Sequence, residues 1–249
     1  KYLKDNKVEY EYFNSINADL AIVVAYGQII PKEFLNLTKK GFINVHASLL
    51  PKWRGAAPIQ RSILNDDKET GICIMKVEKK LDAGPIIKLE KIKINYDDNA
   101  GSIYKKMILV GCPLLVKAMK EIINKDYKMI NQKENLSTYA PKIKKSESRI
   151  MWKDNAEKIN LKIRAFNPFP GAWTKIRGDN KRIKILKSEV VKKKIAHEKN
   201  LVIGKISDSL EVSCGKGFLK ILELQLEGKK ALSSEEFLNG YKIKSLVFE

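Results

Sequence analysis

Two polar side chains, two positions apart, are the strongest candidates for chemistry in the sequence. Asn44 and His46 lie in the run Phe42-Ile43-Asn44-Val45-His46, whose β-branched and aromatic content predicts a strand. Successive side chains of a strand point to opposite faces, so Asn44 and His46 share one face near its carboxyl end. An amide and an imidazole can donate hydrogen bonds to a developing oxyanion, and an imidazole also exchanges protons near neutral pH. Without further support, the pair is more typical of a histidine that only caps a strand.

The cysteines and histidines of the sequence do not form the patterns of a disulfide, redox or metal site. The cysteines, Cys73, Cys112 and Cys214, are scattered and form no C-x-x-C pattern, which predicts reduced, mostly buried thiols. The two histidines, His46 and His197, have no H-x-x-x-H or H-E-x-x-H spacing, so we expect no metal site. His197 lies among lysines, where a loop residue without a chemical role is expected.

The segments around this pair alternate between predicted strands and helices. An apolar run over 19–27 predicts a buried strand, and residues 31–41 begin with proline and end with glycine, as a helix does. After the strand at 42–46, a helix is expected over 57–64 and a third strand over 70–75. This alternation predicts an α/β fold with an open, mostly parallel, Rossmann-like sheet, in which ligands bind at the carboxyl ends of the strands.

The character of the chain changes after a long helix predicted over residues 102–125. Residues 126–148 begin with a polar stretch of little periodicity, which predicts a linker, and one helix follows around Asn155 to Ala165. Five strand-like runs are then expected, at Trp173 to Arg177, Arg182 to Leu186, Leu201 to Ser207, Ser209 to Cys214 and Gly217 to Leu226. These runs predict a small β-barrel. We therefore divide the chain into a catalytic domain (1–125), a linker (126–148) and a C-terminal domain (149–249).

Composition narrows the class of protein and the kind of partner. The 249 residues contain no apolar run long enough to span a membrane, and the charged first residues lack the apolar core of a secretory signal. A cytoplasmic protein is therefore expected. The formal net charge of +19, from 48 lysines and arginines against 29 aspartates and glutamates, favours a polyanionic partner such as nucleic acid. Scattered lysines are equally typical of a solvated surface, so charge alone does not decide.

A longer motif surrounds the two polar residues. The run from Asn44 to Gln60, Asn-Val-His-Ala-Ser-Leu-Leu-Pro-Lys-Trp-Arg-Gly-Ala-Ala-Pro-Ile-Gln, closely resembles the signature of the methionyl-tRNA formyltransferase family. Leu81-Asp82-Ala83-Gly84 lies where that family places its aspartate. An Asn, a His and a later Asp-x-Gly are shared by the wider group of 10-formylfolate transferases, and the Trp-Arg-Gly-Ala-Ala-Pro-Ile-Gln extension narrows the match.

Later motifs extend the resemblance over nearly the whole chain. Thr138-Tyr139-Ala140 followed by Lys142, and Arg164-Ala165-Phe166-Asn167-Pro168, resemble the linker and second-domain motifs of the same family. The resemblance implies a formyltransferase domain followed by an OB-like tRNA-binding domain. It also implies transfer of a formyl group from 10-formyltetrahydrofolate to the free amino group of methionyl initiator tRNA, for translation initiation.

The resemblance assigns catalytic roles to three residues. Asn44 and His46 would donate hydrogen bonds to the oxyanion that forms when the amine attacks the formyl carbon. Asp82 would orient His46, favour its charged form and help relay a proton through a water. The amine has a pKa of about 8 and is nucleophilic without a covalent enzyme intermediate, so no activated Ser or Cys is required.

Binding residues are also implied by the resemblance. The folate would lie against two segments, consisting of Tyr26, Gly27, Gln28 and Ile30, and of Ser48, Leu49, Leu50 and Pro51. The tRNA would contact Arg54, Lys142, Lys144, Lys145 and Arg149. Considered singly, each leucine is equally typical of core packing, and each lysine of a solvated surface. We expect a monomer that binds initiator methionyl-tRNA and folate, without a metal and without a membrane.

The sequence departs from the family pattern at its front. It does not begin with Met, and by resemblance roughly two βα modules, about 60 residues, precede the strand at 19–27 in the family. We therefore expect an exposed sheet edge beside Ala21 to Ala25, and the activity of this polypeptide is an open question. Two alternatives remain: another 10-formylfolate transferase, acting on a nucleotide sugar or on glycinamide ribonucleotide, and a truncated, non-enzymatic RNA-binding remnant.

Overall fold

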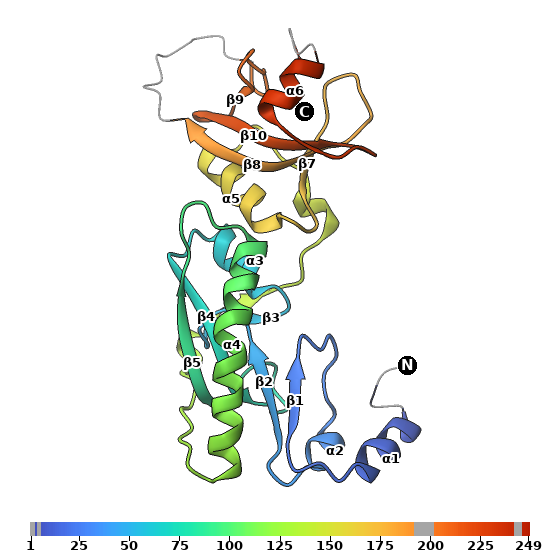
Figure 1. The fold of residues 1–249 in the computed structure, drawn as a ribbon, viewed down its shortest axis with the longest axis vertical. Coiled ribbons are helices and arrows are strands. Elements are labelled where there is room, and N and C mark those ends of the chain that lie inside the picture. Colours follow the sequence, from blue (N-terminus) through green and yellow to red (C-terminus); the bar gives the residue numbers. More distant parts are fainter. Residues whose placement is uncertain (1–2, 4–5, 192–201, 242–245) are drawn as a thin grey trace. The chain divides into compact units, whose positions relative to one another are not determined.

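The computed structural model describes residue 3 and residues 6–191, 202–241 and 246–249, and it divides into two compact units (Figure 1). The first unit contains Lys1–Ser62, Asp67–Asn95 and Ile103–Lys142. The second contains Ile63–Asp66, Tyr96–Ser102 and Ile143–Glu249. Most of the segment expected as a linker, 126–148, therefore belongs to the first unit.

A four-stranded sheet forms the first unit. It contains β1 (Ala21–Val24), β2 (Phe42–His46), β4 (Glu69–Lys76) and β5 (Ile86–Lys93), in the order β1-β2-β4-β5. The α/β class is confirmed, but only β1 and β2 run parallel, whereas β2 with β4 and β4 with β5 are antiparallel. The expectation of a mostly parallel sheet is therefore wrong for the described strands. β5 was not predicted, and it turns back directly after β4 through the loop that carries Asp82.

Helices and short strands flank this sheet. They are α1 (Lys7–Ser15), α2 (Lys32–Leu35), α3 (Pro58–Leu64) and α4 (Ala100–Ile123), with two short paired strands, β3 (Arg54–Gly55) and β6 (Tyr139–Ala140). α1 was not predicted, and α2 has one turn where a helix over 31–41 was expected, because its carboxyl end is already capped at Asn36. α4 matches the long helix expected over 102–125 and continues through Pro113.

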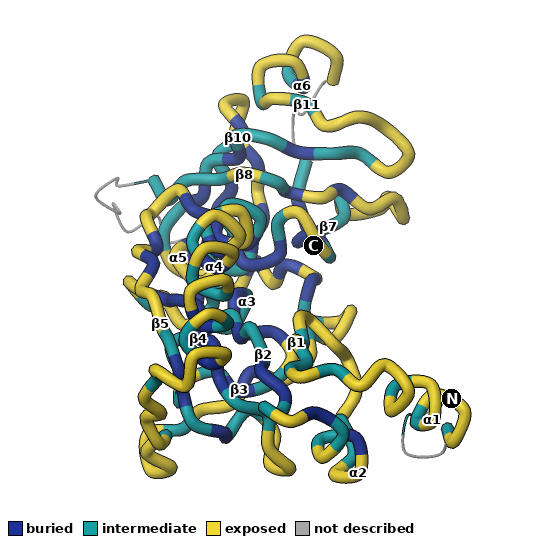
Figure 2. The backbone as a smooth tube through the Cα atoms, turned by 60° about the horizontal axis from the view of Figure 1, so that its bottom comes forward, coloured by how far each residue is buried: buried dark blue, intermediate teal, exposed yellow. Residues whose placement is uncertain are grey.

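The core of the first unit lies between the sheet and α4. Ile43, Ile74 and Ile87 from the sheet pack with Ala118 and Ile122 from α4. β4 is the most buried strand, because all its residues from Thr70 to Met75 are shielded from solvent (Figure 2). The strand β2 is thus anchored by its pairing with the buried β4 and by the packing of Ile43 in this core.

β1 lies at the edge of the described sheet. Its only pairing partner among the described residues is β2, and Ile22 and Val24 remain 41% and 61% exposed. The expected exposed edge beside Ala21 to Ala25 is therefore present in the structure.

The second unit is an antiparallel sheet with one long helix. η3 (Lys145–Ser148) and α5 (Ala156–Phe166) precede β7 (Ala172–Thr174), β8 (Ile183–Val191), β9 (Glu211–Ser213), β10 (Phe218–Leu226), β11 (Ala231–Ser233) and α6 (Ser234–Gly240). The order is β11-β10-β8-β7, with β9 also paired to β10. A strand-rich domain is confirmed, and isolated bridges join Val247 and Phe248 to it. The strand expected over 201–207 begins outside the described residues, and its described part forms only single bridges at Lys205 and Ile206.

Candidate active site

Asn44, His46 and Asp82 converge at the carboxyl end of β2. The Nδ2 atom of Asn44 lies 3.5 Å from Oδ1 of Asp82, and Nδ1 of His46 lies 3.7 Å from Oδ2 of the same carboxylate. Asn44 and His46 share one strand face, as their spacing predicts, and the loop after β4 brings Asp82 to that face. The structure thus assembles an amide, an imidazole and a carboxylate within a few ångströms.

The position of Asp82 depends on an unusual backbone conformation. Asp82 has a φ of 47°, in the left-handed region that few non-glycine residues adopt. Its Oδ2 accepts a hydrogen bond of 2.8 Å from the backbone N–H of Gly55. Behind it, Gly84 lies so close to the carbonyl of Lys76 that a Cβ at this position would come within 1.9 Å of the oxygen. The loop is therefore fixed by close backbone packing on both sides of Asp82.

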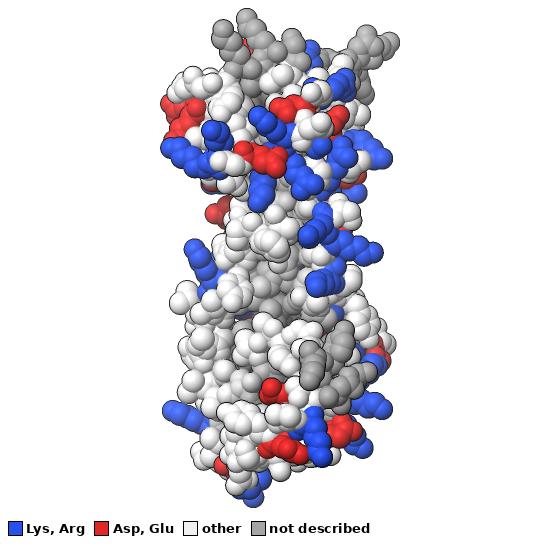
Figure 3. Space-filling model, turned by 90° about the vertical axis from the view of Figure 1, so that its right-hand side faces the viewer, with Lys and Arg blue, Asp and Glu red and all other residues white. Residues whose placement is uncertain are grey.

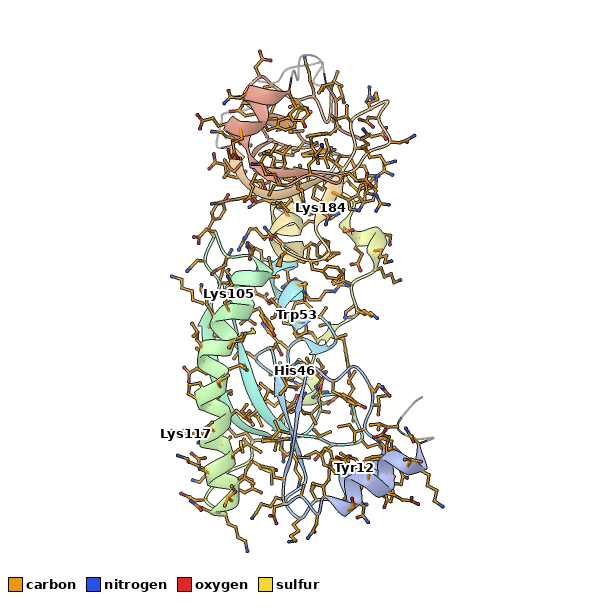
Figure 4. The ribbon with its side chains drawn as sticks, turned by 45° about the vertical axis from the view of Figure 1, so that its right-hand side comes forward. Tyr12, His46, Trp53, Lys105, Lys117 and Lys184 are labelled. Carbon is orange, nitrogen blue, oxygen red and sulfur yellow. The ribbon has the colours of Figure 1, made fainter. Side chains whose placement is uncertain are left out.

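The imidazole of His46 is held from its other side by the loop that follows β2. Nε2 lies 3.0 Å from the backbone carbonyl of Trp53, and Figure 4 shows the two residues near each other. Because a carbonyl can only accept a hydrogen bond, Nε2 carries the proton in this arrangement. Nδ1 is then the nitrogen that faces the carboxylate of Asp82.

Burial controls the protonation of His46. The side chain is 6% exposed, and the cost of burying a charge lowers the pKa of His46 below its ordinary value of 6.5. The negative charge of Asp82 and the hydrogen bond to Trp53 raise the pKa, but by less than burial lowers it. The charge of Asp82 thus favours the charged form of His46, as the resemblance implies, but burial outweighs this influence on the pKa. At neutral pH the imidazole is neutral, and the carboxylate stabilises it only once it gains a proton.

The segments expected to hold folate begin at the same edge of the sheet. β1 and β2 are parallel, with Val24 in register with Val45, so the loops that follow both strands start side by side. Tyr26, Gly27 and Gln28 are exposed and Ile30 is half-buried. Among the residues of the second segment, Ser48 and Leu50 are buried, whereas Leu49 and Pro51 are partly exposed.

Two residues of this second segment have structural partners. The Ser48 hydroxyl donates a hydrogen bond of 2.6 Å to the carbonyl of Lys52. Leu50 packs with Cys73, Met75 and Ile86. Both side chains thus shape the loop from inside the protein.

Arg54 does not occupy the position of a residue that contacts tRNA. Its side chain is 0% exposed, and its guanidinium donates hydrogen bonds to Gln132 and Glu134. A guanidinium that is enclosed inside the protein is not accessible to an external phosphate. The expected tRNA contact of Arg54 is therefore corrected to an internal one.

The remaining basic residues of the expected tRNA site are exposed. They are Lys142, Lys144, Lys145 and Arg149. In the second unit, Arg149 and Arg182 lie over the ring of Trp173, with guanidinium carbons 5.8 and 4.3 Å from its centroid. On the face shown in Figure 3, Lys and Arg side chains are numerous over the second unit, with Asp and Glu side chains between them. This face of the unit therefore presents many basic side chains to solvent.

A segment that was expected to be a free linker contacts the site. Residues 130–140, which we call the strap, run along the loops that carry Trp53 and Asp82. The hydroxyl of Thr138 accepts from the Trp53 N–H at 2.9 Å, and the carbonyl of Thr138 accepts from the Arg54 N–H at 2.9 Å. The polar composition of this segment gave no signal of these contacts, which join residues far apart in the sequence.

The thiols and acidic groups offer no second reactive centre within the described residues. Cys73 and Cys214 are buried, and burial raises the pKa of Cys73 to about 11 and that of Cys214 to about 12, so both thiols are protonated at neutral pH. Cys112 is exposed. In the described ranges, no three His, Cys, Asp or Glu side chains are grouped so that they could hold a metal ion. None of the helices described is long and apolar enough to cross a membrane.

Comparison with protein families matches both parts of the chain. The model described as "Formyl transferase" matches residues 3–119, and "Formyl transferase, C-terminal domain" matches residues 142–242. The methionyl-tRNA formyltransferase of Pelagibacter ubique is 49% identical over 243 residues, which are 97% of this chain and 76% of that protein. The enzyme of the same name from Dictyoglomus turgidum is 44% identical over 246 residues, 97% of this chain and 77% of that protein.

Solved structures show the same fold. HypX from Aquifex aeolicus superposes with a TM-score of 0.67 at 20% identity, covering 97% of this chain and 42% of that chain. WlaRD, a sugar 3N-formyl transferase, has a TM-score of 0.65 at 25% identity, covering 87% of this chain and 77% of that chain. This chain therefore shares its fold with HypX and with a sugar formyltransferase.

Proposed function

The chain belongs to the methionyl-tRNA formyltransferase family, and on this premise we propose that it transfers the formyl group of 10-formyltetrahydrofolate to the amino group of methionyl initiator tRNA. The observation that carries the proposal is the convergence of Asn44, His46 and Asp82 at the carboxyl end of β2, within a chain that matches such enzymes over 97% of its length. The sugar-directed alternative has weaker support, because the similarity to a sugar formyltransferase is 25% identity.

The reaction forms a C–N bond between the methionine nitrogen and the formyl carbon and breaks the bond from that carbon to the folate nitrogen. The attacking amine loses a proton, and the departing folate nitrogen gains one. Between these steps the formyl oxygen carries negative charge, which preorganised donors stabilise. The amide of Asn44 supplies one such donor from the edge of the site.

His46 is suited to both stabilisation and proton transfer. It is neutral at neutral pH, so its unprotonated Nδ1 can accept a proton from the attacking amine, and the carboxylate of Asp82 at 3.7 Å stabilises the imidazolium that forms. In the structure, the Nε2–H group of His46 donates a hydrogen bond to the Trp53 carbonyl. We assign to the same N–H group a second hydrogen bond, to the formyl oxygen when the substrate is bound. The imidazolium then returns the proton to the folate nitrogen as the bond from that nitrogen to the formyl carbon breaks, which restores the neutral imidazole.

The substrates are bound on two surfaces. The folate donor lies against the loops that follow β1 and β2, where Tyr26, Gly27, Gln28 and Ile30 offer backbone groups and apolar surface beside the catalytic residues. The tRNA lies along the basic second unit and the exposed residues Lys142, Lys144, Lys145 and Arg149, through contacts to phosphates. The acceptor tRNA belongs to protein synthesis, and we therefore assign the enzyme to the cytoplasm.

The test is formyl transfer from labelled 10-formyltetrahydrofolate to methionyl initiator tRNA, measured with purified chain and with the His46→Ala variant. We expect product with the chain, and a rate at least about a hundredfold lower with the variant, because one oxyanion donor and the base are removed together. The same assay with a nucleotide-linked amino sugar tests the alternative acceptor. Formylation of the sugar but not of the tRNA would exclude the proposed substrate, and product with neither acceptor would favour an RNA-binding remnant.

A further inference from the structure

One residue of the strap contacts the backbone of the catalytic carboxylate. The Nε2 atom of Gln132 donates two hydrogen bonds, of 2.9 Å to the carbonyl of Asp82 and of 2.7 Å to the carbonyl of Gly84. The first of these carbonyls belongs to the residue whose φ is 47°, and the second lies two residues further on, so the two bonds hold the backbone where it leaves this unfavourable conformation. No other side chain in the described ranges donates to either carbonyl.

Arg54 determines which way the Gln132 amide points. The oxygen of that amide accepts two hydrogen bonds from Arg54, of 3.0 Å from Nε and 2.9 Å from Nη2. A flipped amide would turn its NH₂ group toward the guanidinium and its oxygen toward two carbonyls, losing all four hydrogen bonds. The guanidinium thus locks the amide with its donors on the Asp82 loop.

The guanidinium is itself held by the strap and its neighbours. Nη1 of Arg54 donates to Glu134 at 3.0 Å, and Glu134 also pairs with Lys80. Hydrogen bonds from Lys80 and Arg54 lower the pKa of Glu134, so it remains ionised. A buried arginine needs such partners, because an unpaired charge inside a protein is strongly unfavourable. Lys80 precedes Asp82 by two residues. The loop that carries Asp82 is therefore held at two places, by Gln132 at Asp82 and Gly84 and by Glu134 at Lys80.

We propose that Gln132, held by Arg54, is a positioning residue that sets the orientation of Asp82 toward His46. The inference rests on the role proposed for Asp82 in formyl transfer. Gln132 touches neither reacting group, and it acts through the backbone of the loop after β4. The strap is thereby part of the catalytic machinery and not only a connection to the second unit.

Two substitutions at one position separate orientation from packing. Gln132→Met removes the two donors and the acceptor at similar volume, whereas Gln132→Glu keeps a bidentate partner for Arg54 and removes only the donors. We expect both to lower kcat by about ten- to a hundredfold with KM for each substrate within about threefold, because a displacement of a catalytic group by about 1 Å costs that much. Gln225→Met is the matched control, since its Nε2 donates to the carbonyl of Lys229 at 2.9 Å in the second unit.

A double-mutant cycle tests whether Gln132 acts through Asp82. In an Asp82→Asn background, Gln132→Met should lower kcat by less than about threefold, because the group that it positions has lost its charge. Losses that multiply would overturn the proposal, as would wild-type kcat in Gln132→Glu together with a loss in Gln132→Met. The latter result would mean that satisfying Arg54 is the whole role of Gln132.

A readout that needs no turnover separates this proposal from the function itself. The chain has two histidines, so the pKa of His46 can be measured by NMR titration, with His197→Asn to assign the signals. The carboxylate of Asp82 raises the pKa of His46. Gln132→Met should therefore lower that pKa, in the same direction as Asp82→Asn and by less. An unchanged pKa in Gln132→Met would overturn the positioning role even if the chain showed no formyl transfer.

Discussion

His46 combines deep burial with a carboxylate neighbour, and the two influences act in opposite directions on its pKa. Burial dominates and lowers the pKa of His46 below 6.5. Between the folded and unfolded pKa values the unfolded chain binds more protons, so protonation favours unfolding. The contribution of His46 to stability is therefore complete above pH 6.5 and is lost as the pH falls from 6.5 through the folded pKa.

This linkage predicts a measurable pH dependence of stability. We expect the free energy of unfolding to decrease between about pH 7.5 and about pH 5.5, and we expect part of that decrease to be absent in His46→Gln. Urea unfolding of both proteins at several pH values measures the difference. A steeper loss of stability in the variant than in the wild type would contradict the burial of a neutral imidazole.

The charge of Asp82 should matter for the rate more than for the fold. Asp82→Asn keeps an acceptor for the Gly55 N–H but removes the charge that stabilises the imidazolium. We expect kcat to fall by about a hundredfold and the acidic limb of the pH–rate profile to move to lower pH, because the pKa of His46 loses its raising influence. Steady-state rates across the pH range measure both effects, and an acidic limb that moves to higher pH would be inconsistent with this role.

Single residues differed in how well the sequence predicted them. The common face of Asn44 and His46 follows from the period of two along a strand, and the structure confirms it. Arg54 was misassigned because charged side chains are rarely fully buried, and only its partners in the strap explain the exception. Gln132 had no local signal, since its contacts lie 48 to 78 positions back in the chain.

At the scale of elements, the turn between β4 and β5 carries the catalytic carboxylate on a closely packed backbone. A Cβ at Gly84 would lie 1.9 Å from the carbonyl oxygen of Lys76, and real contacts of this kind do not occur. We expect Gly84→Ala to lower the melting temperature and kcat together, because the loop must shift to make room. Gly240→Ala is the control, as nothing lies within 4 Å of its added methyl. Thermal unfolding and formyl transfer of both variants test this, and normal activity in Gly84→Ala would show that the loop is not rigid.

Several elements of the first unit were predictable, but the relative directions of its strands were not. Apolar runs located β1, β2 and β4 and the long helix α4 within a few residues. A buried apolar run has the same sequence pattern in a parallel strand as in an antiparallel one. The antiparallel direction of β4 relative to β2 therefore depends on the path of the connecting segment. The short strands β3 and β6 escaped prediction because their pairing is purely non-local.

At the scale of the whole molecule, the excess of positive charge predicts salt-dependent tRNA binding. Each phosphate contact contributes about 0.7 to 0.9 to the slope of log K against log salt concentration. Lys144→Ala combined with Lys145→Ala should reduce that slope by about one to two, whereas Lys7→Ala combined with Lys39→Ala removes the same charge and should leave the slope nearly unchanged. Binding titrations at several salt concentrations measure the slopes. Equal reductions in the two double variants would indicate a diffuse field instead of a defined contact.

The contacts of the strap with the active site can form only late in the synthesis of the chain. The hydrogen bond from the Trp53 N–H to the Thr138 hydroxyl joins residues 85 positions apart, so it cannot form until the ribosome has released both. Asn44, His46 and Asp82 emerge first, and β1, β2, β4 and β5 can pair while residues 130–140 are still being made. A nascent chain of that length holds every catalytic side chain and lacks the segment that aligns them. We therefore expect catalytic competence to arise only after residues 130–140 have left the ribosome.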